Sequence, residues 1–295
     1  MTITTVQQGA PPVEYLALSI TGRCQLACTH CFASSGPDGT HGTMTADDWE
    51  RLLDEAAAMG VRRVQFIGGE PTLHPGLARL VRLAVEAGMR VEVFTNLLHV
   101  TDSHWSAFEL PGVTLATSYY SPDPQAHARI TGRPGSHART RANLAEALRR
   151  GITVRGAVID INDDAEAARA ELAALGVTAQ PADRVRHVGR AAPPGVTPAL
   201  SELCGRCGQG RAAISPDGEV SPCSISAWMT AGSVREQPLA QILSSAQWRE
   251  LAASILAPRS SDCQPGCKPS TGDGGDCAPA EHEACGPDYC KPDLP

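Results

Sequence analysis

The sequence lacks the segments that place a protein in or across a membrane. No uninterrupted apolar run reaches the length of a membrane span, and the first residues contain neither the basic stretch nor the apolar core of a signal peptide. A surplus of basic residues is also missing, because the 295-residue chain carries a formal net charge of -7. Nucleic-acid binders normally present a concentrated basic face. We therefore expect a cytoplasmic protein with neither a membrane nor a nucleic acid as partner.

Cysteine is absent from the long stretch between Cys31 and Cys204, although the chain has 11 cysteines. Three lie close together near the start, and the other eight begin at Cys204. Cytosolic thiols stay reduced, so clustered cysteines in such a protein indicate metal sites rather than disulfides. This distribution predicts two separate metal regions.

Residues 45–180 alternate amphipathic helices with short runs rich in β-branched or aromatic residues. The expected strands lie at residues 14–21, 62–69, 91–96, 113–121 and 152–159. Thr45 is the expected N-cap of the first helix. Four helices end on a glycine that stops the helix just before a strand, at Gly60, Gly88, Gly151 and Gly176. Helical connections indicate parallel strands, and repeated βα units predict an α/β fold, a partial (β/α)6 TIM-like barrel.

The pattern changes after residue 190. A proline-rich linker leads to a hairpin that turns at Pro216, Asp217 and Gly218, and one helix-like segment spans residues 239–255. From residue 260 onward Gly, Pro, Asp and Cys dominate without apolar periodicity, so the tail can be ordered only by ligands or docking. We expect an N-terminal extension at 1–13, a barrel at 14–190, a small Cys-rich region with hairpin and helix at 191–259, and a tail contributing cysteine ligands at 260–295.

Cys24, Cys28 and Cys31 form a CxxxCxxC loop directly after the first expected strand. Three thiolates on so short a loop can hold three irons of a cubane [4Fe-4S] cluster and leave the fourth iron without a protein ligand. An open iron is a reaction site. The competing interpretation is a zinc site that takes His30 or a distant residue as its fourth ligand.

A second motif, Gly68-Gly69-Glu70-Pro71, follows the next strand. Two glycines let a backbone approach a ligand closely, although such a tetrapeptide alone is more often a turn. With Phe32 directly after the third cysteine, the two motifs resemble the radical S-adenosylmethionine superfamily. The resemblance implies that S-adenosylmethionine binds the open iron, receives an electron and yields a 5′-deoxyadenosyl radical, which makes the three loop cysteines catalytic. It also implies that Glu70 or a neighbouring carbonyl accepts from the methionine ammonium.

Weaker correspondences to the superfamily lie at later strand ends. Thr95 and Asn96 occupy the place of a frequent TN pair. Ser118 stands where a polar side chain can reach the ribose or the methionine carboxylate. For each residue, capping of a strand end by a polar side chain is an equally good explanation.

Residues 127–136 resemble the loop that many peptide-modifying members place after this strand, with Thr131 where an arginine is common. The carboxylate contact then falls to Arg129, with Arg133 and Arg155 as substitutes, and solvent-facing arginine is the alternative for all three. Further candidate cavity residues, without an assigned proton donor or acceptor among them, are Tyr119, Tyr120, Asp160 and His187.

The spacing of Cys207, Gly218 and Cys223 resembles the first half of the SPASM extension, an auxiliary-cluster domain of many peptide-modifying radical enzymes, and Cys204 adds a CxxC. The alternative is a structural zinc knuckle. The resemblance implies one or two auxiliary [4Fe-4S] clusters. The remaining candidate ligands do not reproduce the usual spacings, and the sequence cannot pair them: Cys263, Cys267, Cys277, Cys285 and Cys290.

The resemblance favours hydrogen abstraction from a residue of a ribosomally made precursor peptide, giving a cross-link, a dehydrogenation or an epimerisation. It implies a flavodoxin-type or ferredoxin-type reductant as partner. Only about a dozen residues precede the first expected strand, so we expect the peptide to dock on the barrel or on a separate recognition protein. The alternatives are a small-molecule substrate, such as a cofactor or antibiotic precursor, and a non-catalytic iron-sulfur electron carrier or zinc-binding interaction protein.

Overall fold

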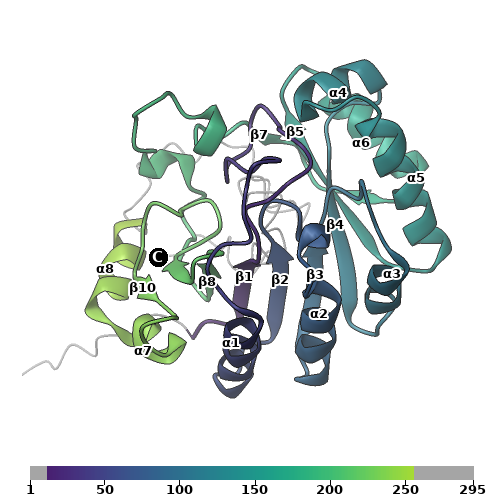
Figure 1. The fold of residues 1–295 in the computed structure, drawn as a ribbon. Coiled ribbons are helices and arrows are strands. Elements are labelled where there is room, and N and C mark those ends of the chain that lie inside the picture. The colour runs from purple at the N-terminus through teal and green to yellow at the C-terminus, as the bar shows by residue number, and fades with distance from the viewer. Residues whose placement is uncertain (1–11, 256–295) are drawn as a thin grey trace, which may run out of the picture.

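The computed structural model describes residues 12–255, whose first five strands form a parallel sheet in chain order (Figure 1). All five coincide with strands expected from the sequence. Two short strands, β6 (Thr178–Ala179) and β7 (Asp183–Arg184), pair with β5, and the sheet stays open as in a partial barrel. The first five are β1 (Tyr15–Ser19), β2 (Arg63–Ile67), β3 (Arg90–Phe94), β4 (Val113–Tyr119) and β5 (Val154–Asp160).

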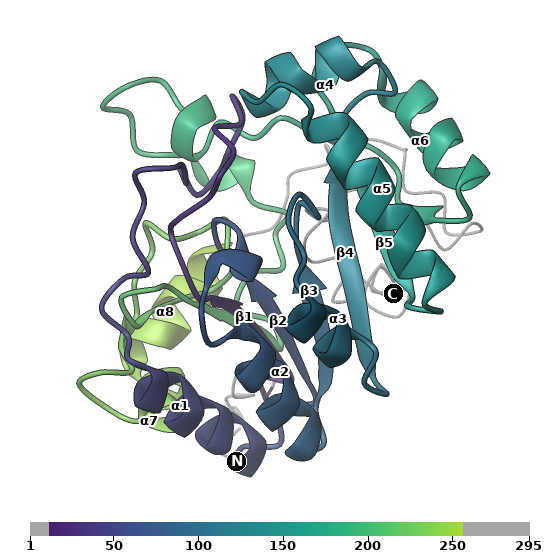
Figure 2. The ribbon, with the colours of Figure 1, turned by 45° about the vertical axis from the view of Figure 1, so that its right-hand side comes forward.

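Helices connect these strands and cover the outer face of the sheet (Figure 2). Within residues 12–255, every helix is too short or too polar to cross a lipid bilayer. The helices of this part are α1 (Ala46–Ala58), the 3₁₀ turn η1 (Pro71–Leu73), α2 (Leu77–Glu86), α3 (Asp102–Phe108), α4 (Pro124–Thr131), α5 (Ser136–Arg149) and α6 (Ala165–Ala174).

The helix ends follow the signals in the sequence, with one correction. Thr45 caps α1 as predicted: its hydroxyl accepts from the Asp48 backbone, and the Asp48 carboxylate accepts from the Thr45 backbone. The predicted loop at 127–136 is wrong in its first part, because residues 127–131 belong to α4. Asp123 caps α4 and Pro124 opens it, which are ordinary start signals of a helix.

The two faces of the sheet bury different side chains, since neighbours along a strand point to opposite sides. Outward residues such as Leu16, Val64 and Val93 join the helices in the main apolar core. The inner face carries a polar layer near the amino ends of the strands. There the Glu92 carboxylate pairs with Arg155 at 2.8 Å and accepts from Gln65 at 2.6 Å.

The sequence after residue 190 extends the same sheet. Strand β8 (Arg211–Ile214) pairs parallel with β1, and β9 (Glu219–Ser221) completes the predicted hairpin. The single helix expected at 239–255 is wrong: Ser245 is extended and separates two helices, and its hydroxyl accepts from the Trp248 backbone. Further elements are η2 (Gly189–Ala191), η3 (Leu200–Glu202), β10 (Gly232–Ser233), α7 (Leu239–Ser244) and α8 (Ala246–Ile255).

Replacing Trp49 tests how much α1 contributes to the core. The Trp49 side chain is fully buried, and its indole N–H has no partner within residues 12–255. We expect Trp49→Ala to lower the free energy of unfolding by about 3–5 kcal/mol because it leaves a large cavity. Trp49→Phe, which removes the unpaired N–H and keeps most of the ring volume, should lower it much less. Urea unfolding followed by circular dichroism measures both, and equal losses would contradict the cavity argument.

Candidate active site

The parallel strands end at one edge of the sheet, where the predicted motifs meet. The segment after β1, residues 22–36, contains the three amino-terminal cysteines and is called the cysteine loop. It borders a cavity, the cysteine cavity, together with the ends of β2 to β5 and the segment after β7. The lining residues are Cys24, Leu26, Cys28, His30, Cys31, Phe32, Ser35, Ile67, Gly68, Gly69, Phe94, Asn96, Ser118, Tyr120, Ile159, Asp183, Val185, Arg186 and Ile225.

The three cysteines of the loop share this cavity. Burial is the main cause that raises the pKa of the Cys24 and Cys28 thiols to about 12. Thiols bind metal as thiolates, so a thiolate in this dry place needs a cation beside it. Three thiols on one cavity fit the three protein ligands that a cubane with an open iron takes.

The zinc interpretation requires a compact group of ligands. His30 lines the cavity beside the cysteines, and its Nδ1 atom is buried without a partner in the part of the chain described. Burial lowers the pKa of His30 to about 4, so the ring is neutral at pH 7. Yet among residues 12–255 no group of three or more His, Cys, Asp or Glu side chains is arranged to hold a single metal ion. Three thiols and one neutral imidazole are thus the donors that this cavity offers.

The two glycines after β2 lie directly against the backbone of the cysteine loop and the turn before it. The Gly69 N–H donates to the Thr21 carbonyl at 2.6 Å, and the Glu70 N–H donates to the Arg23 carbonyl at 2.8 Å. A Cβ atom on Gly68 or Gly69 would lie 2.3 Å from one of these carbonyl oxygens. Gly68 has φ +134° as well, a conformation that favours glycine. The close approach that the sequence predicts for a ligand is already made by the protein's own backbone.

Glu70 does not line the cavity, because its carboxylate is fully buried among protein donors. It accepts from the Thr95 hydroxyl at 2.6 Å, from the Asn96 N–H at 2.7 Å and from Thr72. Burial raises the pKa of Glu70, and these donors oppose that rise. Pro71, buried in η1, continues the same turn. Glu70 thus ties the end of β2 to the end of β3.

Asn96 carries this support on to the cysteines. Its side-chain amide lies 3.8 Å from the Cys24 sulfur, and its carbonyl oxygen accepts from the Gln25 side chain and the Leu98 N–H. Thr95 is buried behind it and does not line the cavity.

Side-chain alternation along β4 decides which predicted residues face the cavity. Ser118 and Tyr120 line it, and the Tyr120 hydroxyl hydrogen-bonds with Ser118 and with Cys28. Tyr119 points to the opposite face, where its hydroxyl contacts His137 and Glu171. The candidate cavity residues Tyr119, Asp160 and His187 are therefore wrong, and only Tyr120 of the four lines the cavity.

The three predicted arginines lie elsewhere. Arg129 is exposed on α4 and does not line the cavity. Arg133 donates to the Gln25 carbonyl from the outer side of the cysteine loop. Arg155 is paired with Glu92 deeper in the barrel.

Arg190, which no sequence motif singles out, holds the cysteine loop. Its guanidinium donates to the backbone carbonyls of Cys28, Ser34 and Ser35, and its N–H donates to the Cys31 carbonyl at 2.9 Å. Every residue type has the same backbone carbonyl acceptor, so no sequence pattern can indicate this contact. The only signal is the isolated basic stretch at residues 184–190.

An ion pair faces the cysteines across the cavity and was also missed. Arg186 contacts both carboxylate oxygens of Asp183, at 2.9 and 3.0 Å, and both side chains are 9% exposed. Burial raises the pKa of Asp183, with Arg186 acting in the opposite direction. A paired carboxylate and guanidinium are the main charged groups on this apolar wall.

A second group of cysteines lies under the hairpin. Cys204, Cys207 and Cys223 are buried in one apolar cluster, and the sulfurs of Cys207 and Cys223 are 3.0 Å apart. Hydrogen bonds with Cys204 and Cys223, together with burial, raise the pKa of Cys207. Gly218 turns the hairpin with φ +88°. The other predicted ligands lie outside the described residues: Cys263, Cys267, Cys277, Cys285 and Cys290.

Comparison with known families agrees with this arrangement. A family model of the radical SAM superfamily matches residues 18–170, which include the end of β1, the cysteine loop and β2 to β5. The chain belongs to the radical SAM superfamily. A second model, the SPASM iron-sulfur cluster-binding domain, matches residues 204–268 of this radical SAM protein.

Curated relatives match part of the radical SAM chain. It is 37% identical over 145 residues to a PqqA peptide cyclase of Ruegeria pomeroyi, which is 48% of this chain and 38% of that protein. It is 31% identical over 136 residues to an AdoMet-dependent heme synthase of Methanosarcina barkeri, 46% of this chain and 39% of that protein. The chain thus spans well under half the length of these relatives.

Solved structures show the same radical SAM fold. The structure of Streptococcus suis SuiB bound to precursor peptide SuiA superposes with a TM-score of 0.69 at 16% identity, covering 85% of this chain and 68% of that one. Native anSMEcpe with bound AdoMet and Cp18Cys peptide gives a TM-score of 0.63 at 12% identity, with 86% of each chain covered.

Removing Arg190 should loosen the cluster of this radical SAM protein. We expect Arg190→Ala to lose iron about tenfold faster than the parent after anaerobic reconstitution, because outer contacts orient metal ligands. Arg190→Lys keeps the charge but has fewer hydrogen-bond donors, so its rate of iron loss should lie between those of the parent and Arg190→Ala. Arg184→Ala is the matched control, since that exposed arginine pairs with Glu202 and Ser201 instead. Iron release to a chelator measures the rates, and equal rates in all variants would contradict the role of Arg190.

Proposed function

We propose that this chain cleaves S-adenosylmethionine reductively and abstracts a hydrogen atom from a residue of a ribosomally made precursor peptide. The observation that carries the proposal is the cysteine cavity, where three thiols, two glycines and the ends of the parallel strands β2 to β5 share one space. In this proposal residues 14–190 carry the radical chemistry. Residues 191–259, with the tail at 260–295, hold one or two auxiliary clusters.

The residues of the cavity have distinct tasks. When bound to Cys24, Cys28 and Cys31, a [4Fe-4S] cluster supplies the electron that splits S-adenosylmethionine and releases the 5′-deoxyadenosyl radical. The apolar residues Ile67 and Phe94 exclude water from the space where such a radical would act. The remaining residues proposed to contact the nucleoside or the methionine portion are Phe32, Gly68, Gly69, Asn96 and Ser118.

Glu70 and Thr95 act in this proposal by holding the site rather than by touching the cofactor. The Glu70 carboxylate accepts hydrogen bonds from Thr72, Thr95 and Asn96. These bonds fix Asn96 next to Cys24. Pro71 limits the freedom of the same turn. Arg129 has no contact with the cavity, so we assign it no part in the reaction.

A peptide substrate is supported by the names of the relatives. One matched relative is a peptide cyclase, and SuiB was solved with a precursor peptide. A small-molecule substrate is the second candidate, because another relative is a heme synthase. Incubation with a precursor peptide encoded beside the gene for this chain, followed by mass spectrometry, separates the two: a mass change in the peptide supports the first.

Cofactor cleavage depends on the cysteine loop. We expect Cys28→Ala to abolish formation of 5′-deoxyadenosine and to lower the iron content by about four atoms per chain. Arg184→Ala, which removes an exposed side chain that pairs with Glu202 and the Ser201 carbonyl, should retain both. Anaerobic reconstitution, reduction in the presence of S-adenosylmethionine and chromatography of the nucleoside provide the measurement. Formation of 5′-deoxyadenosine by Cys28→Ala at the parental rate would refute the assignment.

The second cysteine group should act after cofactor cleavage. We expect Cys223→Ala to lose about four irons and still form 5′-deoxyadenosine, with much less modified substrate per nucleoside produced. The physical reason is that Cys223 lies in a separate apolar cluster from Cys24 and Cys28. The ratio of modified substrate to 5′-deoxyadenosine measures the effect. An unchanged ratio would exclude a chemical role for the auxiliary region.

A further inference from the structure

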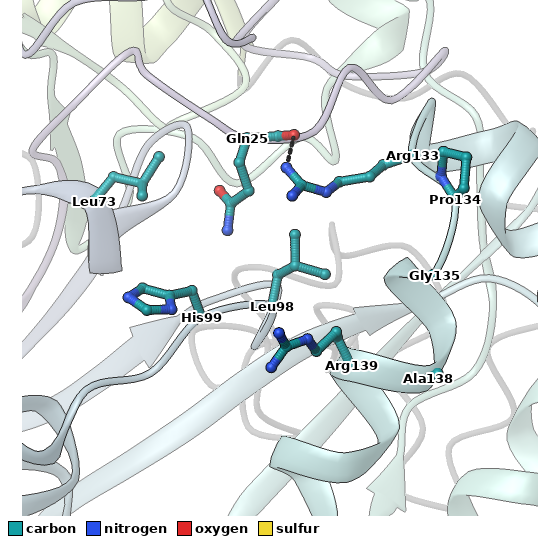
Figure 3. Close-up of a pocket in the computed structure, with 9 residues that line it drawn as sticks. All are labelled: Gln25, Leu73, Leu98, His99, Arg133, Pro134, Gly135, Ala138 and Arg139. Atoms are coloured by element: carbon teal, nitrogen blue, oxygen red, sulfur yellow. Dashed lines mark hydrogen bonds between the residues drawn. The ribbon is translucent and has the colours of Figure 1, made fainter.

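A second cavity of about 640 Å³ lies on the other side of the cysteine loop (Figure 3). Gln25 lines this cavity, whereas its neighbour Cys24 lines the cysteine cavity. The other walls come from the segment after β3 and from the start of α5. We call it the arginine cavity, and its lining residues are Gln25, Leu73, Leu98, His99, Arg133, Pro134, Gly135, Ala138 and Arg139.

The charge of this cavity is opposite to that of the whole chain. Arg133, Arg139 and His99 line it and no acidic residue does, although the chain carries a net charge of -7. All three basic side chains are exposed. The Arg139 side chain has no hydrogen-bond or ion-pair partner within the described part of the chain, and Figure 3 shows it extending from α5 beside Leu98. The cavity is therefore a local anion-attracting surface on an acidic protein.

The position of Arg139 does not serve the stability of its helix. It lies in the first turn of α5, where a cation opposes the helix dipole and an acidic residue would be favourable. That turn has no acidic residue and no side-chain cap. A local choice that works against the fold is expected where function requires it.

Only one layer of side chains separates the arginine cavity from a loop thiol. Leu98 packs in one apolar cluster with Cys24, and the Gln25 side chain lies 3.9 Å from the Cys24 sulfur. Electron transfer between proteins falls steeply with distance, so this thin wall is a short path to whatever Cys24 binds. The cysteine cavity offers no such access during turnover, because in the proposed function the cofactor and substrate fill it.

We propose that the arginine cavity is the docking surface for an acidic one-electron donor protein of the flavodoxin class. This inference rests on the proposed function, since it assigns the entry point for the electron that the reaction needs. One electron leaves the reduced flavin of the donor and enters the oxidised cluster through the Cys24 side; the flavin is oxidised by one electron, and no covalent bond changes in this step. Acidic groups around the flavin edge pair with Arg133, Arg139 and His99.

Charge reversal at Arg139 tests this surface. Arg139→Glu changes an exposed side chain on α5 that, within the described part of the chain, makes no hydrogen bond to the cysteine loop, so the fold and the cluster should survive. We expect reduction of the cluster by a photoreduced flavodoxin, followed in stopped flow by the bleaching of its visible absorption, to slow on the order of tenfold at low salt. High salt should shrink the difference by screening the charges. Arg90→Glu is the matched control, an exposed arginine at the amino edge of β3, and should reduce at the parental rate.

A small reductant separates docking from chemistry. Reduced methyl viologen is a small cation that needs no acidic docking surface, so it should reduce Arg139→Glu at least as fast as the parent. The same reductant should drive 5′-deoxyadenosine formation in both. Failure of that formation in the parent would refute the proposed function. Unchanged reduction of Arg139→Glu by flavodoxin, with cofactor cleavage intact, would overturn the docking proposal alone, even if the variant bound a substrate peptide less tightly.

Discussion

The cysteine loop is held by hydrogen bonds that its backbone carbonyl groups accept. The rest of the site depends on how closely the donors, the turn after β2 and Arg190, approach these carbonyls. The carbonyls of Arg23 in the loop and of Thr21 just before it accept from the turn after β2, and that turn comes near enough only because two glycines lack a Cβ atom. On the other side Arg190 reaches three more carbonyls of the loop. These contacts fix the loop that carries the three thiols, which is the preorganisation a reactive site needs.

Much of this arrangement could be predicted from the sequence, because local signals and periodicity specify it. The five strands, the Thr45 cap and the hairpin follow from patterns that neighbouring residues carry. The loop cysteines and the glycines of the second motif line one cavity, and their roles there stay a prediction. The break at Ser245 was missed because the apolar pattern continues across it, although a serine is an ordinary helix cap.

The contacts that could not be predicted join residues far apart in the chain. Some of them use backbone groups, which are the same in every residue type and leave no mark in the sequence. Arg190 bonds to backbone carbonyls more than 150 positions earlier, and Asp183 meets the cysteines only through the fold of the sheet. Tyr119 and Tyr120 illustrate a different limit, since a shift of one residue sends a side chain to the other face. Glu70 shows a third limit, because the sequence motif does not reveal that its carboxylate oxygens accept from protein donors.

The parallel pairing of β1 with β8 affects how the chain folds while the ribosome is still synthesising it. Strand β1 is synthesised first among these strands. One of its edges has no partner strand until residues 211–214 have been synthesised, after β2 to β5. Pairings between such distant segments form slowly, and an open strand edge invites pairing with other chains. A nascent chain that pauses before the hairpin would therefore expose an aggregation-prone strand edge close to the loop cysteines. The rate of elongation and early binding of a chaperone should then affect the yield of folded protein.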